Sequence, residues 1–248
     1  MIEVNNLSKT FGEKHVLKDI NVRFEAGVTN LIIGASGSGK STLARCLVGL
    51  VEPEKGEVLY DGRDFVHMKN KERKDVRKEM GFLFQGSALF DYMTVEENVR
   101  FPLDILTSLS SKEKQMRVDQ VLERVEMPDV HKLYPSELSG GMKKRVGIAR
   151  AISPNPKYLF CDEPNSGLDP QTSIVIDGLI HEITRENNIT TLVITHDMNS
   201  VMEIGDFIMF IYKGEKWWEG TNKEMMETDN QEILEFVNAA GMMTRKQQ

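Results

Sequence analysis

The chain has 248 residues, of which 40% are hydrophobic and 28% charged, so it can bury a full core and is neither disordered nor fibrous. Lys and Arg total 31 against 38 Asp and Glu, and this net charge of −7 disfavours general attraction to nucleic acid or to an anionic membrane. The longest strongly apolar run, residues 207–212, is far shorter than the ~20 residues that span a bilayer, and we expect neither a membrane span nor a signal peptide.

The first part of the chain predicts strands, a glycine loop and a helix, in that order. Residues 2–24 mix apolar and polar side chains at short period, with turns at Gly12 and Gly27, which predicts short strands. The apolar run 30–33 predicts a buried strand that leads into a glycine-rich loop, residues 34–42. Apolar residues then recur at the spacing of a helix with one buried face. This stripe consists of Leu43, Cys46, Leu47 and Leu50.

Three later apolar runs predict strands that are buried on both faces and separated by helical stretches. They cover residues 158–161, 191–194 and 207–211. This alternation predicts an α/β fold with a mostly parallel sheet. Cys46 and Cys161 fall on predicted core faces, and two cysteines are too few for a disulfide framework, so we expect a reducing cytosolic setting.

The middle and the end of the chain predict further helices. Residues 86–145 are expected to form a helical insertion, because capping boxes occur at Thr94 with Glu97 and at Ser110 with Glu113. The second box precedes an apolar stripe of Val118, Val121, Leu122 and Val125. The charged stretch 69–79 predicts a solvated helix face.

The C-terminal segment predicts two short helices that end at Gly241. The capping pattern occurs there twice, at Thr221 with Glu224 and at Asp229 with Glu232. We expect the apolar stripe of the second helix to pack on the rest of the chain or on a second copy. The stripe consists of Ile233, Leu234, Phe236 and Val237.

The glycine loop predicts a phosphate site. The segment from Gly34 to Ser41 fits G-x-x-x-x-G-K-[ST], in which backbone N–H groups converge on phosphate oxygens at a helix N-terminus. Lys40 is expected to reach the β and γ phosphates, and the Ser41 hydroxyl to bind Mg²⁺. The expected nucleotide contacts in this loop are Gly34, Ala35, Ser36, Gly37, Ser38, Gly39, Lys40, Ser41 and Thr42.

Polar residues follow two of the predicted strands. Asp162 and Glu163 end the strand 158–161, and adjacent carboxylates there are costly unless a cation compensates for them. Asp162 suits Mg²⁺ binding and Glu163 suits the general base of phosphoryl transfer to water. His196 follows the strand 191–194, where it can reach a ligand at the carboxyl edge of the sheet.

Residues 138–142, Leu-Ser-Gly-Gly-Met, with Lys-Lys-Arg behind them at 143–145, resemble the signature of ABC-transporter ATPase subunits. The resemblance implies a P-loop NTPase (RecA-like) core with an N-terminal antiparallel β subdomain and an inserted helical subdomain. It also implies a head-to-tail dimer in which each ATP lies between the phosphate loop of one copy and the signature of the other. Ser139, Gly140 and Gly141 fit this role, because a small-residue helix N-terminus is a second anion site.

The same resemblance implies roles for four residues outside these motifs. Phe11 would stack on adenine, although a core position is an alternative for this side chain. Gln85 would contact Mg²⁺ and the attacking water and signal to a membrane partner. Asp169, in the segment 166–169, would cross the dimer interface, and His196 would hydrogen-bond the γ phosphate. The implied cofactors are ATP and Mg²⁺, and the implied catalytic residues are Glu163, His196 and Gln85.

Two departures from the family pattern are informative. Asn165 stands where Thr or Ser is common, and Met142 replaces the glutamine that usually ends the signature. Met at this position, together with the segments 84–91 and 94–103, is similar to the ATPases of Mla and other Mce-associated phospholipid transporters. The resemblance implies integral permease subunits, a periplasmic or membrane-anchored lipid-binding subunit, and a place at the cytoplasmic face of the inner membrane.

The resemblance implies an ABC ATPase domain over residues 1–220 and a helical tail over 221–248. Within the domain, residues 1–85 and 146–220 would form the α/β core and 86–145 the helical subdomain. An ABC ATPase for an amino acid or other small solute is the close alternative. A non-transport ABC ATPase, such as an iron-sulfur assembly factor, is the other. We expect no nucleic-acid partner, and the filled chemical roles argue against a silent cassette.

Overall fold

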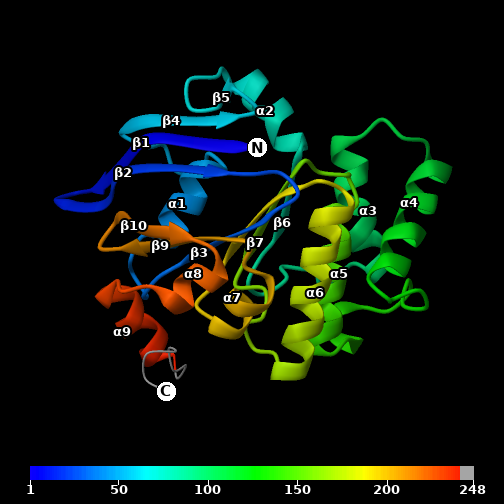
Figure 1. Cartoon of the computed structure of the whole chain (residues 1–248). Helices are drawn as coiled ribbons and strands as arrows, with labels where there is room; N and C mark the ends of the chain where they lie inside the picture. The colour runs from blue at the N-terminus through cyan, green and yellow to red at the C-terminus, as the bar shows by residue number, and fades with distance from the viewer. Residues whose placement is uncertain (241–248) are drawn as a thin grey trace. The chain divides into compact units, whose positions relative to one another are not determined.

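The computed structural model describes residues 1–240, which divide into two compact units (Figure 1). Among the described residues, the first unit contains 1–77 and 190–240, and the second contains 78–189. No helix in the described part of the chain is long and apolar enough to cross a membrane.

The first unit contains an antiparallel sheet in the order β2-β1-β4-β5. Its strands are β1 (Ile2–Phe11), β2 (Lys14–Phe24), β4 (Lys55–Tyr60) and β5 (Arg63–Asp64). Ile2, Val4 and Leu7 of β1 are buried, and Ile2 pairs with Phe24 of β2. The predicted antiparallel β subdomain is confirmed, with strands that are longer than expected.

The same unit contains β3, the buried strand that leads to the phosphate loop, and its neighbours in the sheet. β3 (Thr29–Ile33) pairs in parallel with β8 (Thr190–Ile194) and with β9 (Phe207–Tyr212), and all five residues of both β3 and β8 are buried. β10 (Glu215–Gly220) returns antiparallel to β9 after a tight turn. Continuous burial explains why β3, β8 and β9 are mostly apolar without alternation.

Five helices lie in the described part of the first unit, and α1 is shorter than the periodicity suggests. They are α1 (Lys40–Leu47), α2 (Asn70–Lys78, its last residue in the second unit), α7 (Met198–Ile204), α8 (Asn222–Glu227) and α9 (Gln231–Ala239). The prediction that Leu50 belongs to the buried stripe of α1 is wrong, because α1 ends at Leu47 and Leu50 is 73% exposed. Gly49, with φ 71°, turns the chain away from the helix axis.

The C-terminal helices begin at one predicted cap and one different residue. Thr221 forms the expected capping box of α8 with Glu224. The cap of α9 is Asn230 rather than Asp229, because the Asn230 Oδ1 accepts from the N–H of Ile233 at 3.1 Å. Phe236 packs against Phe210 of β9 with ring centroids 5.3 Å apart, so the apolar stripe of α9 covers this unit. The predicted stop at Gly241 lies outside the described residues.

The second unit pairs two parallel strands and carries the helices of the middle of the chain. β6 (Met80–Leu83) pairs with β7 (Tyr158–Asp162). The helices are α3 (Val95–Leu106), α4 (Ser111–Arg124), α5 (Gly140–Ile152) and α6 (Pro170–Glu186), with a short 3₁₀ turn at Pro135–Glu137. Both predicted capping boxes are present at α3 and α4, and the stripe on α4 is buried. The expected subdomain boundary at residue 145 falls inside α5.

Helix α5 approaches β6 closely at two glycines, and one of them has backbone where a side chain would begin. A Cβ on Gly81 of β6 would lie 2.3 Å from the carbonyl oxygen of Ala151. A Cβ on Gly147 of α5 would lie 2.8 Å from Cδ1 of Leu83. The position of α5 therefore depends on these two glycines.

We predict that Gly81→Ala lowers the free energy of unfolding by about 1–3 kcal/mol, because the added methyl group meets backbone rather than a flexible side chain. Gly178→Ala is the matched control, since a Cβ at that position in α6 meets nothing within 4 Å. The control is expected to raise the free energy of unfolding by about 0.5–1 kcal/mol. Urea denaturation of the two variants measures both effects, and equal stability would contradict the close packing of α5 on β6.

Candidate functional site

The phosphate loop joins β3 to α1 and depends on glycine geometry. Gly34, Gly37 and Gly39 have φ values of 147°, 77° and 116°. Residues other than glycine rarely adopt these backbone conformations. A Cβ on Gly34 would lie 2.3 Å from the carbonyl oxygen of Ile211. The loop therefore places its backbone close to β9 before it turns into α1.

The donors of this loop suit a polyanion. Gly39 caps α1 without a side-chain hydrogen bond, so no side chain of the cap covers the N–H groups of the first turn. Lys40 is 9% exposed and its Nζ donates to the carbonyl oxygens of Gly34 at 2.7 Å and Ala35 at 3.0 Å. The buried Ser38 Oγ has no hydrogen-bond partner within residues 1–240, and Ser41 is exposed. A phosphate group would satisfy such donors.

His196 follows the neighbouring strand at the same edge of the sheet. Ile32 of β3 pairs with Ile194 of β8 in parallel, so the chain leaves both strands on the side of the phosphate loop. His196 is exposed, and Asp197 behind it caps α7 by accepting from Asn199 N at 2.9 Å. The first unit thus brings His196 to the edge at which the loop begins, as the sequence predicts.

Phe11 ends β1 and is not a core residue. Its side chain is 50% exposed, and Lys9 Nζ lies 5.1 Å from the ring centroid. The alternative of a core Phe is therefore excluded for this residue. An exposed ring is free to stack on a planar ligand.

In the second unit, the two acids follow β7 at a strained turn. Asp162 is the last residue of β7, and Glu163 has φ 47°, in the left-handed region. The departure at Asn165 has a structural explanation, because its Nδ2 donates to the buried Oδ2 of Asp177 on α6 at 2.7 Å. Both acids are partly exposed and can meet a ligand from solvent.

Both cysteines are core residues, as predicted. Burial raises the pKa of the Cys46 thiol to about 11. Burial also raises the pKa of Cys161, and the negative charge of Asp177 raises it further. Both thiols are therefore protonated at neutral pH and take no part in the chemistry of the site.

The signature forms the start of α5. Ser139 caps the helix, and its Oγ accepts from the N–H of Met142 at 3.3 Å. A cleft of about 440 Å³ lies between the starts of α5 and α6. Gly141 lines this cleft, and a Cβ there would lie 2.7 Å from Cγ2 of Thr172 on α6. The N-terminus of α5 therefore borders a cleft that a ligand can enter, and Gly141 leaves little space between α5 and Thr172 of α6.

Asp169 borders the same cleft as the cap of α6. It accepts from Thr172 N at 3.0 Å and from Thr172 Oγ1 at 2.5 Å. These hydrogen bonds hold the pKa of Asp169 below its usual range. The carboxylate is therefore ionised at the rim of the cleft.

Gln85 follows β6, and its Nε2 donates to the Ser166 Oγ at 3.2 Å. Lys144 of α5, which the sequence did not single out, contacts the same place. Its Nζ donates to the carbonyl oxygen of Gln85 and, at 3.3 Å, to that of Glu163. Burial lowers the pKa of Lys144, and the nearby negative charges of Glu163 and Asp162 oppose this effect. In the sequence this lysine is only one charge in a basic run.

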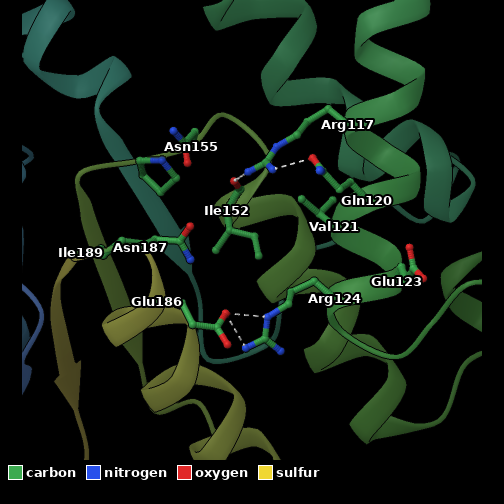
Figure 2. Close-up of a pocket in the computed structure, with 11 residues that line it drawn as sticks. Arg117, Gln120, Val121, Glu123, Arg124, Ile152, Asn155, Glu186, Asn187 and Ile189 are labelled. Atoms are coloured by element: carbon green, nitrogen blue, oxygen red, sulfur yellow. Dashed lines mark hydrogen bonds and ion pairs between the residues drawn. The ribbon is translucent and has the colours of Figure 1, made fainter.

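A separate cavity of about 330 Å³ lies among α4, the end of α5 and the end of α6 (Figure 2). Arg117 donates to the carbonyl oxygens of Ile152 at 3.0 Å and Ser153 at 2.9 Å. Arg124 pairs with Glu182 and Glu186. Both guanidinium groups are therefore used within the protein, and none of the predicted site residues lines this cavity.

Comparison with known proteins agrees with this geometry. The family model described as "ABC transporter" matches residues 17–166. Two solved structures share the fold. The dimeric bacterial ABC transporter cassette MJ0796 has a TM-score of 0.81 at 33% identity over 90% of this chain and 99% of that one. The cbiO1 protein of Clostridium perfringens has a TM-score of 0.85 at 31% identity over 96% and 94%.

The curated relatives differ in the transport named for them. The chain is 36% identical to the intermembrane phospholipid transport ATP-binding protein MlaF of Haemophilus influenzae, over 96% of this chain and 90% of that one. It is 40% identical to the methionine import ATP-binding protein MetN of Vibrio vulnificus over 96% and 71%. It is 35% identical to a probable ribonucleotide transport ATP-binding protein of Mycobacterium tuberculosis over 96% of this chain, but it spans only 66% of that protein. The chain belongs to the ABC transporter family.

Proposed function

We propose that this chain is the ATP-binding and hydrolysing subunit of an ABC transporter. The observation that carries the proposal is the phosphate loop, with glycines that bring its backbone against β9 and an α1 terminus that has no side-chain cap. Membership of the family and the presence of Asp162, Glu163, His196 and the signature support it. A related cassette is described in a post-hydrolysis state bound to ADP and Pi.

The residues divide the work of phosphoryl transfer among them. The loop N–H groups and Lys40 would bind the β and γ phosphates, and Phe11 would stack on the adenine. Glu163 would orient the attacking water and accept its proton, and His196 would hydrogen-bond the γ phosphate. Catalysis then rests on positioning and charge stabilisation rather than on a covalent intermediate.

The residues present also fit Mg²⁺. The exposed hydroxyl of Ser41, the amide oxygen of Gln85 and the carboxylate of Asp162 are hard oxygen donors of the kind that this ion prefers. When bound, the ion would neutralise charge on the phosphate oxygens. We propose these three residues as its protein contacts.

A second copy of the chain would complete each site. The cleft beside Ser139, Gly140 and Gly141 holds an open helix N-terminus, which suits the γ phosphate of a nucleotide bound to the other copy. Asp169 at its rim would face the partner. The dimeric state described for the related cassette supports this arrangement.

Glu163→Gln is predicted to lower kcat for ATP hydrolysis at least about 100-fold while ATP still binds, because the amide cannot accept the proton of the attacking water. Glu123→Gln is the matched control, since Glu123 is exposed on α4. The control should hydrolyse ATP at the wild-type rate. Phosphate release and ATP titration measure the two properties, and near-normal hydrolysis by Glu163→Gln would assign the base to another residue.

We further propose a glycerophospholipid as the transported substrate. The support is Met142 at the end of the signature, the segment 84–91 and the similarity to MlaF. Integral permease subunits would carry the lipid, and a periplasmic or membrane-anchored protein would deliver or receive it. The chain would then act at the cytoplasmic face of the inner membrane, with residues 1–220 as the ATPase domain and 221–248 as a helical tail.

The second candidate is import of an amino acid, favoured by the 40% identity to MetN. Purification of the chain with its membrane partners separates the two candidates. We expect glycerophospholipid to copurify and to stimulate ATP hydrolysis in nanodiscs, while methionine leaves the rate unchanged. Stimulation by methionine but not by phospholipid would reject the lipid proposal and leave the ATPase proposal intact.

A further inference from the structure

We propose that Lys144 is a positioning residue that holds the backbone at Gln85 and at Glu163 in a single arrangement. This inference rests on the proposed ATPase function, in which these two residues contact the attacking water. Lys144 itself would touch neither ATP nor water. Its action would pass through the main chain of the two residues that do.

Four residues of the second unit form a closed ring of hydrogen bonds. Lys144 Nζ donates to the carbonyl oxygens of Gln85 and Glu163. The Gln85 side chain continues the ring by donating to the Ser166 Oγ at 3.2 Å. The Ser166 N–H closes it by donating to the Glu163 carbonyl oxygen at 3.1 Å. Each member of the ring therefore has two neighbours, and none can shift alone without loss of a contact.

Burial makes the lysine contacts costly to lose. Lys144 is only 4% exposed, so little water is available to replace the two carbonyl oxygens. A buried ammonium group that loses its acceptors is strongly destabilising, because its charge is left uncompensated. The lysine therefore fixes the two carbonyl groups rather than following them.

Glu163 is the residue that most needs such support. Its φ of 47° lies in the left-handed region, where a residue with a Cβ persists only if its surroundings hold it. Its carbonyl oxygen accepts two hydrogen bonds of the ring, one from Lys144 Nζ and one from the Ser166 N–H. This backbone conformation fixes the direction of the Cα–Cβ bond from which the Glu163 side chain extends.

Helix α5 also contacts the loop after Gln85 through a second side chain, Arg150. Arg150, six residues after Lys144, donates to the carbonyl oxygens of Ser87 and Ala88, the first through Nη2 and the second through Nη1 at 2.7 Å. Ser87 and Ala88 have φ values of 60° and 47°, so this turn is also strained. One helix, which begins with the signature, therefore anchors the loop of Gln85 at two points.

The test compares Lys144→Met with Lys112→Met, a control at an exposed lysine near the start of α4. Met keeps a similar length without the charge or the donors. We expect Lys144→Met to lower kcat for ATP at least about tenfold with KM within about twofold, since the loss falls on positioning rather than on binding. The control should keep both constants.

Hydrogen–deuterium exchange gives a readout that needs no ATP. The N–H groups of Ser87 and Ser166 bond to the carbonyl oxygens of Phe84 and Glu163, so their exchange reports on the two turns. Exchange at both should be faster in Lys144→Met, with β7 unchanged. Wild-type kcat together with wild-type exchange would overturn the inference.

Two further outcomes are also decisive. If Lys144→Met does not fold, Lys144→Arg takes its place, because a guanidinium group keeps the charge and at least two donors. A folded Arg variant should retain kcat within about threefold, and a loss as large as tenfold would overturn the inference. If wild-type protein hydrolysed no ATP, the proposed function would be wrong, and the exchange measurement would still decide whether Lys144 holds the two turns.

Discussion

The packing of helix α5 against β6 is the contact on which the second unit depends. It requires glycine at Gly81, since a Cβ there would overlap the backbone of Ala151, and it is close at Gly147, where a Cβ would displace the end of the Leu83 side chain. The same helix begins with the signature, and its buried cations hold the turn after β6. A small shift of α5 would therefore change the positions of the signature, Gln85 and Glu163 together. Side-chain size at the packing contact governs the geometry of the candidate catalytic residues.

These contacts explain how a chain with a net negative charge would bind a polyphosphate. A net charge of −7 gives no general attraction to a polyphosphate. Binding must instead rest on oriented backbone N–H groups at α1 and α5 and on Lys40, which lies against its own loop. Local dipoles of this kind act over a few ångströms and are little affected by distant acidic residues.

Local signals in the sequence predict much of this fold correctly. The capping boxes at Thr94 and Ser110 form as expected, because each depends on residues only three positions apart. The buried strands are also found where apolar runs occur, since their burial on both faces leaves no other pattern. Leu50 and Asp229 were predicted wrongly at helix ends, where a glycine turn and a competing Asn cap decide the boundary.

The ring around Lys144 could not be predicted from the sequence. It joins residues 85, 144, 163 and 166, whose proximity arises only from tertiary packing. A lysine in a basic run next to the signature looks like a solvated charge, yet this one is buried. The family resemblance suggests the proposed roles of Gln85 and Glu163, whereas no sequence pattern indicates the groups that hold their backbone.

We propose that ATP is held between the phosphate loop of one copy and the signature of another. Sedimentation velocity of the Glu163→Gln protein is the sharpest test, because slow hydrolysis preserves the ATP-bound state. We expect a monomer without nucleotide or with ADP, and a dimer with ATP and Mg²⁺ that is lost when Ser139→Arg is added. A protein that binds ATP tightly and stays monomeric at every concentration would contradict it.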